Sequence, residues 1–192
     1  MDAKNYLQTS FDELKSVVEA TIPIVADDFA RLLDVCANSI RAGGKIMFFG
    51  NGGSAADSQH LATELTVRFI KNRAAIAALA LTTDTSALTA IGNDLGYDEL
   101  FARQIEALGC PGDVVVGIST SGRSPNVLKG LHQARAMNIH AAAFGGGTGG
   151  DLKGLADPLI LIPSTTTARI QEMHIAVGQM LCGALEIELG LV

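Results

Sequence analysis

Hydrophobic positions in the first 42 residues recur every three or four residues, which is the spacing of an amphipathic helix. The pattern is interrupted at Pro23, so two helices are expected before the chain turns at Gly43 and Gly44. The recurring residues are Leu7, Phe11, Leu14 and Val18 before the proline, and Val25, Phe29, Leu32, Val35 and Ile40 after it.

After Gly44 the period changes, and short apolar runs alternate with helical stretches. Strands are expected over residues 45–49, 76–81, 113–118, 139–144 and 158–162. Helices are expected over residues 54–70, 84–92, 97–108, 125–137 and 167–188. This alternation predicts an α/β fold in one domain spanning 1–192: a five-stranded parallel sheet between helical layers, as in flavodoxin- and Rossmann-like proteins, with two extra N-terminal helices. Gly145 to Gly150 is expected to form a flexible loop.

Composition narrows the class of protein. The chain is 48% hydrophobic but only 5% aromatic, so the apolar excess is aliphatic and predicts both a core and a subunit interface. The longest apolar run, Ala74 to Leu81, is too short to span a bilayer.

A net charge of -6 without a basic cluster disfavours binding to nucleic acid or to a membrane surface. No signal peptide is recognised, and Cys36, Cys110 and Cys182 are too widely spaced for a motif, so a cytoplasmic protein with reduced thiols is expected.

Two Ser/Gly-rich turns each follow a strand and open a helix. The first is Gly50-Asn51-Gly52-Gly53-Ser54, and the second is Ser119-Thr120-Ser121-Gly122 with a helix opening at Ser124-Pro125. Unpaired N–H groups and the helix dipole favour an anion at such positions, and serine hydroxyls add donors. Because ligands of parallel sheets bind beyond the carboxyl ends of the strands, the two turns are expected to be neighbours in a phosphate site.

The first turn has two other interpretations. Ser54 with Asp57 three residues later resembles a capping box, which would be purely structural. Gly50-x-Gly52-x-x-Ala55 also matches the dinucleotide fingerprint. The fingerprint requires an acidic residue about 20 positions later, at the end of the second strand, and here that strand ends too late, near Asp84. NAD binding is therefore disfavoured.

The helix after the first turn carries Asp57, His60 and Glu64 on one face. His60 and Glu64 are one turn apart, a common spacing of two metal ligands, although a solvated polar face has the same pattern. Glu64 lies about 15 Å along the axis from Ser54. A sugar chain of several carbons could bridge much of that distance, whereas a triose could not.

The last helix carries Gln171, His174 and Gln179. Gln171 and Gln179 are eight residues apart, about 12 Å along the axis. His174 lies off their line and is interpreted as a core or interface histidine. Asp94 is either a loop cap or a substrate contact, and its spacing does not decide between them.

Four motifs together resemble the phosphoheptose isomerases, also called sedoheptulose 7-phosphate isomerases, which consist of a single sugar-isomerase (SIS) domain. The motifs are Gly50–His60, Leu88–Asp94, Gly117–Gly122 and Ala168–His174. The resemblance covers nearly the whole chain. It implies a homotetramer with active sites at subunit interfaces, with residues 1–42 as a helical extension used in oligomerisation. It also implies conversion of sedoheptulose 7-phosphate to D-glycero-D-manno-heptose 7-phosphate, the first step toward nucleotide-activated heptose for lipopolysaccharide core or capsule.

The resemblance also assigns roles to individual residues. It implies that Glu64 is the catalytic carboxylate, that His60 takes part in catalysis, and that Asp57 is a supporting or proton-relay group. One Zn²⁺ per subunit is expected, with His60, Glu64, Gln171 and Gln179 as its ligands. The substrate and phosphate contacts it implies are Asn51, Gly52, Gly53, Ser54, Asp94, Ser119, Thr120, Ser121, Ser124 and Gln171.

One position departs from the family pattern. The family's second catalytic residue is a histidine eight positions after the motif glutamine, and here that position is Gln179. A neutral amide cannot shuttle protons near pH 7 as imidazole does, although its oxygen can coordinate a metal weakly. Gln179 therefore favours either an impaired isomerase or a non-catalytic adaptor that resembles the replication-initiator-associating protein of the same fold. Retention of Glu64, His60 and the phosphate serines argues against the adaptor.

Overall fold

The strands of this protein form one parallel sheet, which confirms the fold class expected from the sequence. The computed structural model describes all 192 residues. The strand order is β2-β1-β3-β4-β5, and every neighbouring pair is parallel. The strands are β1 (Ile46–Gly50), β2 (Ala78–Ala80), β3 (Val114–Ser119), β4 (His140–Gly146) and β5 (Leu159–Ile162). Each begins and ends within two residues of its expected bounds.

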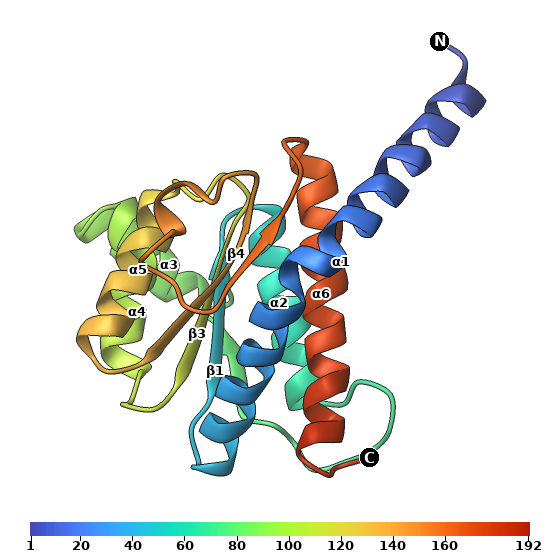
Figure 1. Cartoon of the computed structure of the whole chain (residues 1–192). Coiled ribbons are helices and arrows are strands. Elements are labelled where there is room, and N and C mark those ends of the chain that lie inside the picture. Colours follow the sequence, from blue (N-terminus) through green and yellow to red (C-terminus); the bar gives the residue numbers. More distant parts are fainter.

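Helices cover both faces of the sheet (Figure 1). One face carries α1 (Ala3–Arg41), α2 (Gly53–Thr66) and α6 (Thr167–Glu188), and the other carries α3 (Thr85–Asp94), α4 (Leu100–Leu108) and α5 (Pro125–Ala136). Two short 3-10 helices, η1 (Tyr97–Glu99) and η2 (Gly150–Leu152), lie in connections. None of the helices is long and apolar enough to cross a membrane.

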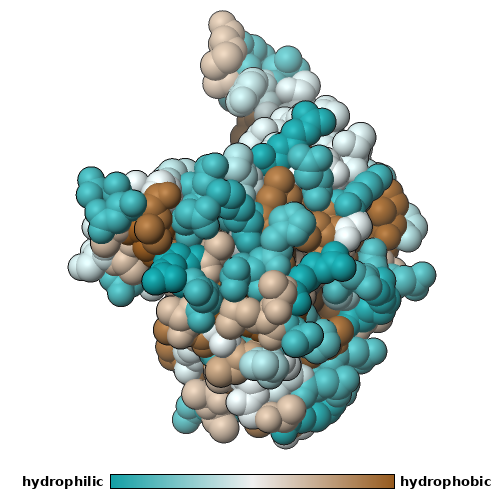
Figure 2. Space-filling model, turned by 90° about the vertical axis from the view of Figure 1, so that its left-hand side faces the viewer, coloured by the Kyte–Doolittle hydropathy of each residue, from teal (hydrophilic) through white to brown (hydrophobic).

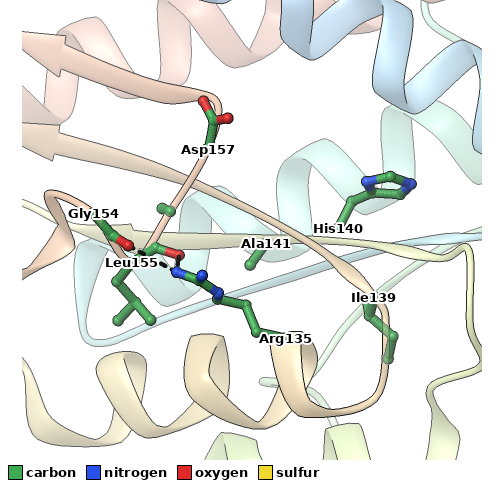
Figure 3. Close-up of a pocket in the computed structure, with 8 residues that line it drawn as sticks. Arg135, Ile139, His140, Ala141, Gly154, Leu155 and Asp157 are labelled. Atoms are coloured by element: carbon green, nitrogen blue, oxygen red, sulfur yellow. Dashed lines mark hydrogen bonds between the residues drawn. The ribbon is translucent and has the colours of Figure 1, made fainter.

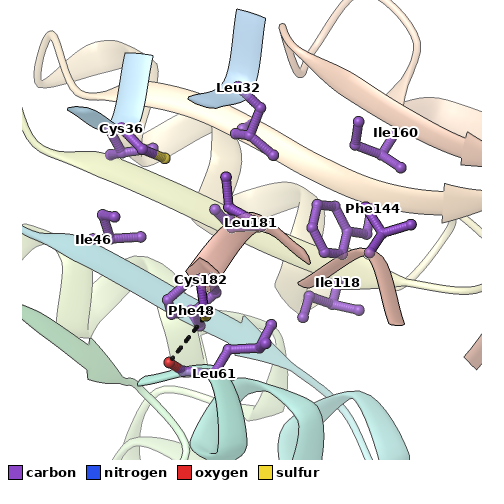
Figure 4. Packing of buried hydrophobic residues seen from close by; sticks show 14 of the residues in the cluster. Leu32, Cys36, Ile46, Phe48, Leu61, Ile118, Phe144, Ile160, Leu181 and Cys182 are labelled. Carbon is purple, nitrogen blue, oxygen red and sulfur yellow. Dashed lines mark hydrogen bonds between the residues drawn. The ribbon is translucent and has the colours of Figure 1, made fainter. Parts of the chain in front are cut away.

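The alternation of side chains along β1 divides the interior into two cores. Ile46 and Phe48 belong to the core under α1, α2 and α6, whereas Met47 and Phe49 belong to the core under the other helical layer. Figure 4 shows the first core, where side chains of the sheet such as Phe48 meet those of the covering helices. All of β1 and β3 is buried, which explains why both strands read as continuous apolar runs.

The expected division of the N-terminal segment into two helices is wrong. A single helix of 39 residues, α1, continues through Pro23. Proline removes only one hydrogen bond of the helical ladder, and the bonds before and after it persist. Buried side chains lie on both sides of the proline, at Val17 and Val25, so packing supports the helix across the interruption.

Two further local expectations are corrected. Ser54 does not cap α2: the helix begins at Gly53, Gly52 is the N-cap with φ of 57°, and no side chain caps it. The N–H of Ser54 donates to the Asn51 carbonyl at 3.0 Å, so the turn closes through the backbone and a capping box with Asp57 is not needed. The expected glycine loop is also shorter, because Gly145 and Gly146 belong to β4 and are buried.

Helices α2 and α6 run side by side in the same direction. Pairs of residues that meet between them advance together along both helices: Gly53 with Gln171, Leu61 with Gly178, and Gly183 with Phe69 just beyond the end of α2. The helices pack closely at Gly178, since a Cβ added there would lie 2.6 Å from Leu61 Cδ1. This parallel register fixes which side chains of α6 can reach which turn of α2.

Adding a methyl group at Gly178 tests this close packing. Gly178→Ala is expected to destabilise the fold by about 1–3 kcal/mol, because the fully buried Leu61 must shift inside a packed core. The matched control is Gly92→Ala in α3, where nothing lies within 4 Å of the added carbon. That change should stabilise by about 0.5–1 kcal/mol, because alanine is the better helix former. Urea denaturation measures both; equal effects at the two glycines would contradict the packing argument.

Candidate active site

The two Ser/Gly-rich turns lie next to each other, as expected. β1 pairs with β3, and Gly50 is in register with Ile118, so the turns that follow leave the same edge of the sheet. Asn51 and Asn126 exchange two amide hydrogen bonds, of 2.8 and 2.9 Å, between the turns. The Tyr97 hydroxyl also donates to Asn51 Oδ1 at 3.0 Å. These contacts hold the starts of α2 and α5 together.

The second turn is held open as a row of hydroxyl groups. Ser119 Oγ accepts the N–H of Gly122 and lies 3.2 Å from Ser124 Oγ, while Ser121 Oγ accepts the N–H of Arg123. Ser124 is the N-cap of α5 with Pro125 behind it, as expected, but its hydroxyl makes no capping bond to that helix. Gly122 has φ of 66°, and a Cβ there would meet the Gly149 carbonyl oxygen at 2.1 Å. The turn therefore requires glycine at this position.

A polar hollow of about 260 Å³ opens beside this turn. Thr120 and Ser121 line it from the end of β3, and hydroxyl side chains before α6 line it from the other side. Its lining residues are Thr120, Ser121, Arg123, Gly146, Gly147, Ser164, Thr165, Thr167 and Ile170. Arg123 and the Ser164-to-Thr167 run were not singled out from the sequence. A run of hydroxyl residues just before a helix, after the last strand, is the signal that could have found them.

The start of α2 is covered by Gln171 of α6. Ser54 is buried, at 3% exposure, in the first turn. A Cβ added to Gly53 would lie 2.6 Å from Gln171 Nε2, so only glycine leaves space for this amide. Gln171 therefore lies beside the first Ser/Gly turn.

Two turns further along α2, three polar side chains converge. His60 Nε2 lies 3.1 Å from Glu64 Oε1 and 3.2 Å from Gln179 Nε2. The side chains of His60 and Glu64 are 48% and 23% exposed, so a ligand can reach them from solvent. An open hollow of about 300 Å³ lies here, lined by Gln59, His60, Thr63 and Glu64.

This group includes three of the four side chains expected to bind metal. Gln171 is separated from the others because it lies beside Gly53 at the start of α2, whereas His60 lies two turns further along the helix. Nowhere in the chain do three His, Cys, Asp or Glu side chains gather in a way that could hold a metal ion. A cation at this position would therefore have one imidazole and one carboxylate as strong ligands, with the Gln179 amide oxygen as a weaker third.

Asp57 is a half-buried acid on the same helix. Its Oδ2 is buried and has no hydrogen-bond partner. Burial raises the pKa of the Asp57 carboxyl, and the nearby positive charge of a protonated His60 opposes that rise. An acid whose pKa is raised can hold a proton closer to neutral pH, which suits a proton relay.

His174 and Asp94 do not join either polar group. His174 is fully buried, and its Nε2–H donates to the Gly145 carbonyl at 3.0 Å, which confirms it as a core histidine. Asp94 is exposed at the end of α3, and its carboxylate accepts from Asn93 Nδ2 at 2.7 Å. It lies three residues before Tyr97, which contacts Asn51.

A larger cavity than these two hollows lies elsewhere. It measures about 590 Å³ and is lined by residues where β4 begins and where the chain approaches β5, the opposite edge from the Ser/Gly turns. Figure 3 shows Arg135 reaching across it toward the carbonyls of Gly154 and Leu155, to which it donates at 2.7 and 3.1 Å. His140 and Asp157 also line this cavity, but Asp157 is paired with Arg31 and the Arg135 guanidinium is already engaged, so we do not place the active site here.

Comparison with known proteins identifies the family of this chain. The SIS domain profile matches residues 9–146. The chain is 56% identical to the phosphoheptose isomerase of Paramagnetospirillum magneticum over 97% of both proteins, and 52% identical to that of Akkermansia muciniphila over 86% of this chain and 87% of the relative. The solved phosphoheptose isomerase of Neisseria gonorrhoeae superposes with a TM-score of 0.90 at 40% identity, covering 96% of this chain and 98% of that one. The one from Francisella tularensis gives 0.94 at 30% identity, covering 97% and 100%.

The buried His174 should make the fold less stable in acid. Burial lowers its pKa from 6.5 to about 4, so between these values the unfolded chain takes up a proton that the folded chain excludes. Its contribution is fully present above pH 6.5 and falls by about 3 kcal/mol as the pH drops to 4. His174→Gln removes this titration and should lose correspondingly less stability over that interval. Urea titrations at several pH values measure this, and parallel curves for the two proteins would contradict it.

Proposed function

The chain belongs to the SIS-domain family and, within it, to the phosphoheptose isomerases, and from that premise we propose that it converts D-sedoheptulose 7-phosphate to D-glycero-D-manno-heptose 7-phosphate. Members of this family are sugar-phosphate isomerases of heptose biosynthesis. The proposed reaction would be the first step toward nucleotide-activated heptose for lipopolysaccharide core or capsule. The observation that carries the proposal is the placement of two polar groups along α2: the two hydroxyl-rich turns lie beside its start, and Glu64 and His60 lie two to three turns further along.

The turns would hold the phosphate. The proposed contacts are Asn51, Gly52, Gly53, Ser54, Ser119, Thr120, Ser121 and Ser124, with Gln171 and Asp94 contacting the sugar. Donors at helix N-termini bind phosphate without a net positive protein, which matters in a chain of net charge -6. Binding the phosphate far from the reacting carbons supplies energy that positions those carbons beside Glu64.

Glu64 would move the proton between carbons. In the ketose the carbonyl is at C2, so Glu64 removes a proton from C1 to give an enediol and returns a proton to C2 to give the aldose. Over the same conversion the O1 hydroxyl loses its proton and O2 gains one. His60 lies 3.1 Å from Glu64, and its imidazole can both accept and donate a proton. Asp57 is a further acid for the relay, because burial raises its pKa.

Two strong ligands and one weaker ligand converge at this point, so a complete metal site needs a further donor. We propose that His60 and Glu64 hold one Zn²⁺ per subunit, with the amide oxygen of Gln179 and, from a neighbouring subunit, that of Gln171 as weaker ligands. When bound, Zn²⁺ would polarise the substrate carbonyl.

Self-association is part of the proposal. The N-terminal half of α1 extends beyond the body of the protein in Figure 1, and Figure 2 shows its tip standing clear of the other elements. This half carries exposed apolar side chains with nothing to cover them within one chain. They are Tyr6, Leu7, Phe11, Val18 and Ile22, each between 37% and 62% exposed. Such a stripe favours a second copy of the helix, and we propose a homotetramer.

Restoring the imidazole at position 179 tests the proposed reaction. Turnover of sedoheptulose 7-phosphate is measured with and without Zn²⁺ for this chain and for Gln179→His. The chain itself should turn over slowly. Gln179→His should raise kcat by roughly 10- to 100-fold with little change in KM, because imidazole adds a proton carrier and leaves the phosphate turns unaltered.

Met180→His is the matched control, since it adds an imidazole to the next, exposed position of α6 and should leave kcat unchanged. No turnover by either this chain or Gln179→His would contradict the proposed enzyme and favour the non-catalytic adaptor.

A further inference from the structure

A buried ion pair outside both polar groups joins the end of α2 to α6. Arg73 lies in the connection that follows α2, and Glu186 lies near the end of α6. Their side chains are 1% and 2% exposed, and Arg73 Nε donates to Glu186 Oε1 at 2.8 Å. None of the chemistry proposed above uses either residue.

The Arg73 guanidinium is hydrogen-bonded to the turn of α2 that carries Glu64. Arg73 Nη2 donates to the Glu64 carbonyl at 2.8 Å, and Nη1 donates to the Leu65 carbonyl at 2.6 Å. Carbonyls in the last turn of a helix have no partner within the helix. Arg73 supplies a partner from outside to both carbonyls, and the Ile76 N–H also donates to the Leu65 carbonyl at 3.1 Å. The guanidinium therefore helps to fix the backbone from which the Glu64 side chain extends.

Glu186 connects this end of α2 to the helix that carries Gln179. Its Oε1 also accepts the N–H of Phe69 at 2.9 Å, which holds the chain just after α2. Glu186 follows Gln179 by seven residues, which is two helical turns, so both side chains project from the same face of α6. This face of α6 therefore contacts His60 through Gln179 and, two turns later, contacts the end of α2 through Glu186.

Stability alone does not account for this arrangement. Removing two charges from water costs as much as their attraction returns, and buried ion pairs are often no more stabilising than apolar side chains of the same size. The pair instead fixes the orientation of the end of α2 relative to α6, because the rigid guanidinium donates to two successive carbonyls and to a carboxylate at once.

We propose that Arg73 and Glu186 are positioning residues that hold Glu64 at its distance from His60 and Gln179. This inference rests on the proposed function for its kinetic consequence. Its structural part, that the pair fixes the last turn of α2, stands without it.

The kinetic test compares Arg73→Lys with a matched pair elsewhere. Lysine keeps the charge but cannot donate to two carbonyls and Glu186 together. A displaced base slows proton transfer, so kcat should fall by about 10- to 100-fold. KM should stay within about 2-fold, because the phosphate turns lie at the other end of α2. Glu186→Gln keeps the Oε1 acceptor for Arg73 and Phe69, so it should retain most of the kcat.

The matched control is Asp113→Asn. Asp113 is 2% exposed, pairs with Lys45, and accepts the backbone N–H groups of Lys45 and Cys110 at the opposite edge of the sheet. Both Asp113→Asn and Arg73→Lys should lower the melting temperature, but only Arg73→Lys should lower kcat at temperatures where each protein is folded. Equal kcat values for the two variants would overturn the proposal.

Amide hydrogen exchange separates this inference from the proposed function. In Arg73→Lys, exchange should accelerate over residues 64–69 and stay unchanged at the start of α2, whereas Asp113→Asn should leave residues 64–69 protected. Unchanged exchange over 64–69 in Arg73→Lys would overturn the proposal even if its kcat falls. If the unaltered chain shows no isomerase activity, the proposed function fails, and exchange alone decides whether the pair fixes this turn.

Discussion

Helices α2 and α6 pack in parallel at a distance set by glycine, and the arrangement of the candidate site depends on that contact. Gly178 leaves the space that Leu61 occupies, and Gly53 leaves the space for Gln171. With the two helices in this register, Gln179 meets His60 and Glu186 meets the chain after α2. A bulkier residue at the contact would change the separation of every pair along it, including the pair in the site.

The sheet supplies the second fixed reference. Because β1 and β3 are adjacent and in register, both hydroxyl-rich turns begin at one edge, and the Asn51–Asn126 amide pair holds them together. α2 starts at this edge and carries Glu64 and His60 two to three turns away from it. One helix therefore joins a place that suits a phosphate to a place that suits proton transfer. A substrate that uses both must be long enough to reach from one to the other.

The sequence predicted the sheet and the two turns well, because strands buried on both faces read as apolar runs and glycine marks the turns. The neighbourhood of His60 and Glu64 followed from helical spacing. Other features required the packed structure. Helix α1 persists through Pro23 because buried contacts lie on both sides. Gly52 rather than Ser54 is the N-cap of α2. That Gln171 lies beside Gly53 while Gln179 meets His60 depends on the register of α6 against α2, which is a tertiary property. Arg73 gave no signal, since its partners are backbone carbonyls and a distant glutamate.

The central claim is that Glu64, at this position on α2, moves the carbon-bound proton. Solvent deuterium incorporation tests this claim most directly. The reaction is run in D₂O with sedoheptulose 7-phosphate, and deuterium at C2 of the aldose product is measured by NMR. The account predicts deuterium at C2 with the unaltered chain and none above background with Glu64→Gln. Glu106→Gln, on the exposed surface of α4, should behave like the unaltered chain. Deuterium incorporation by Glu64→Gln at the rate of the unaltered chain would contradict the account.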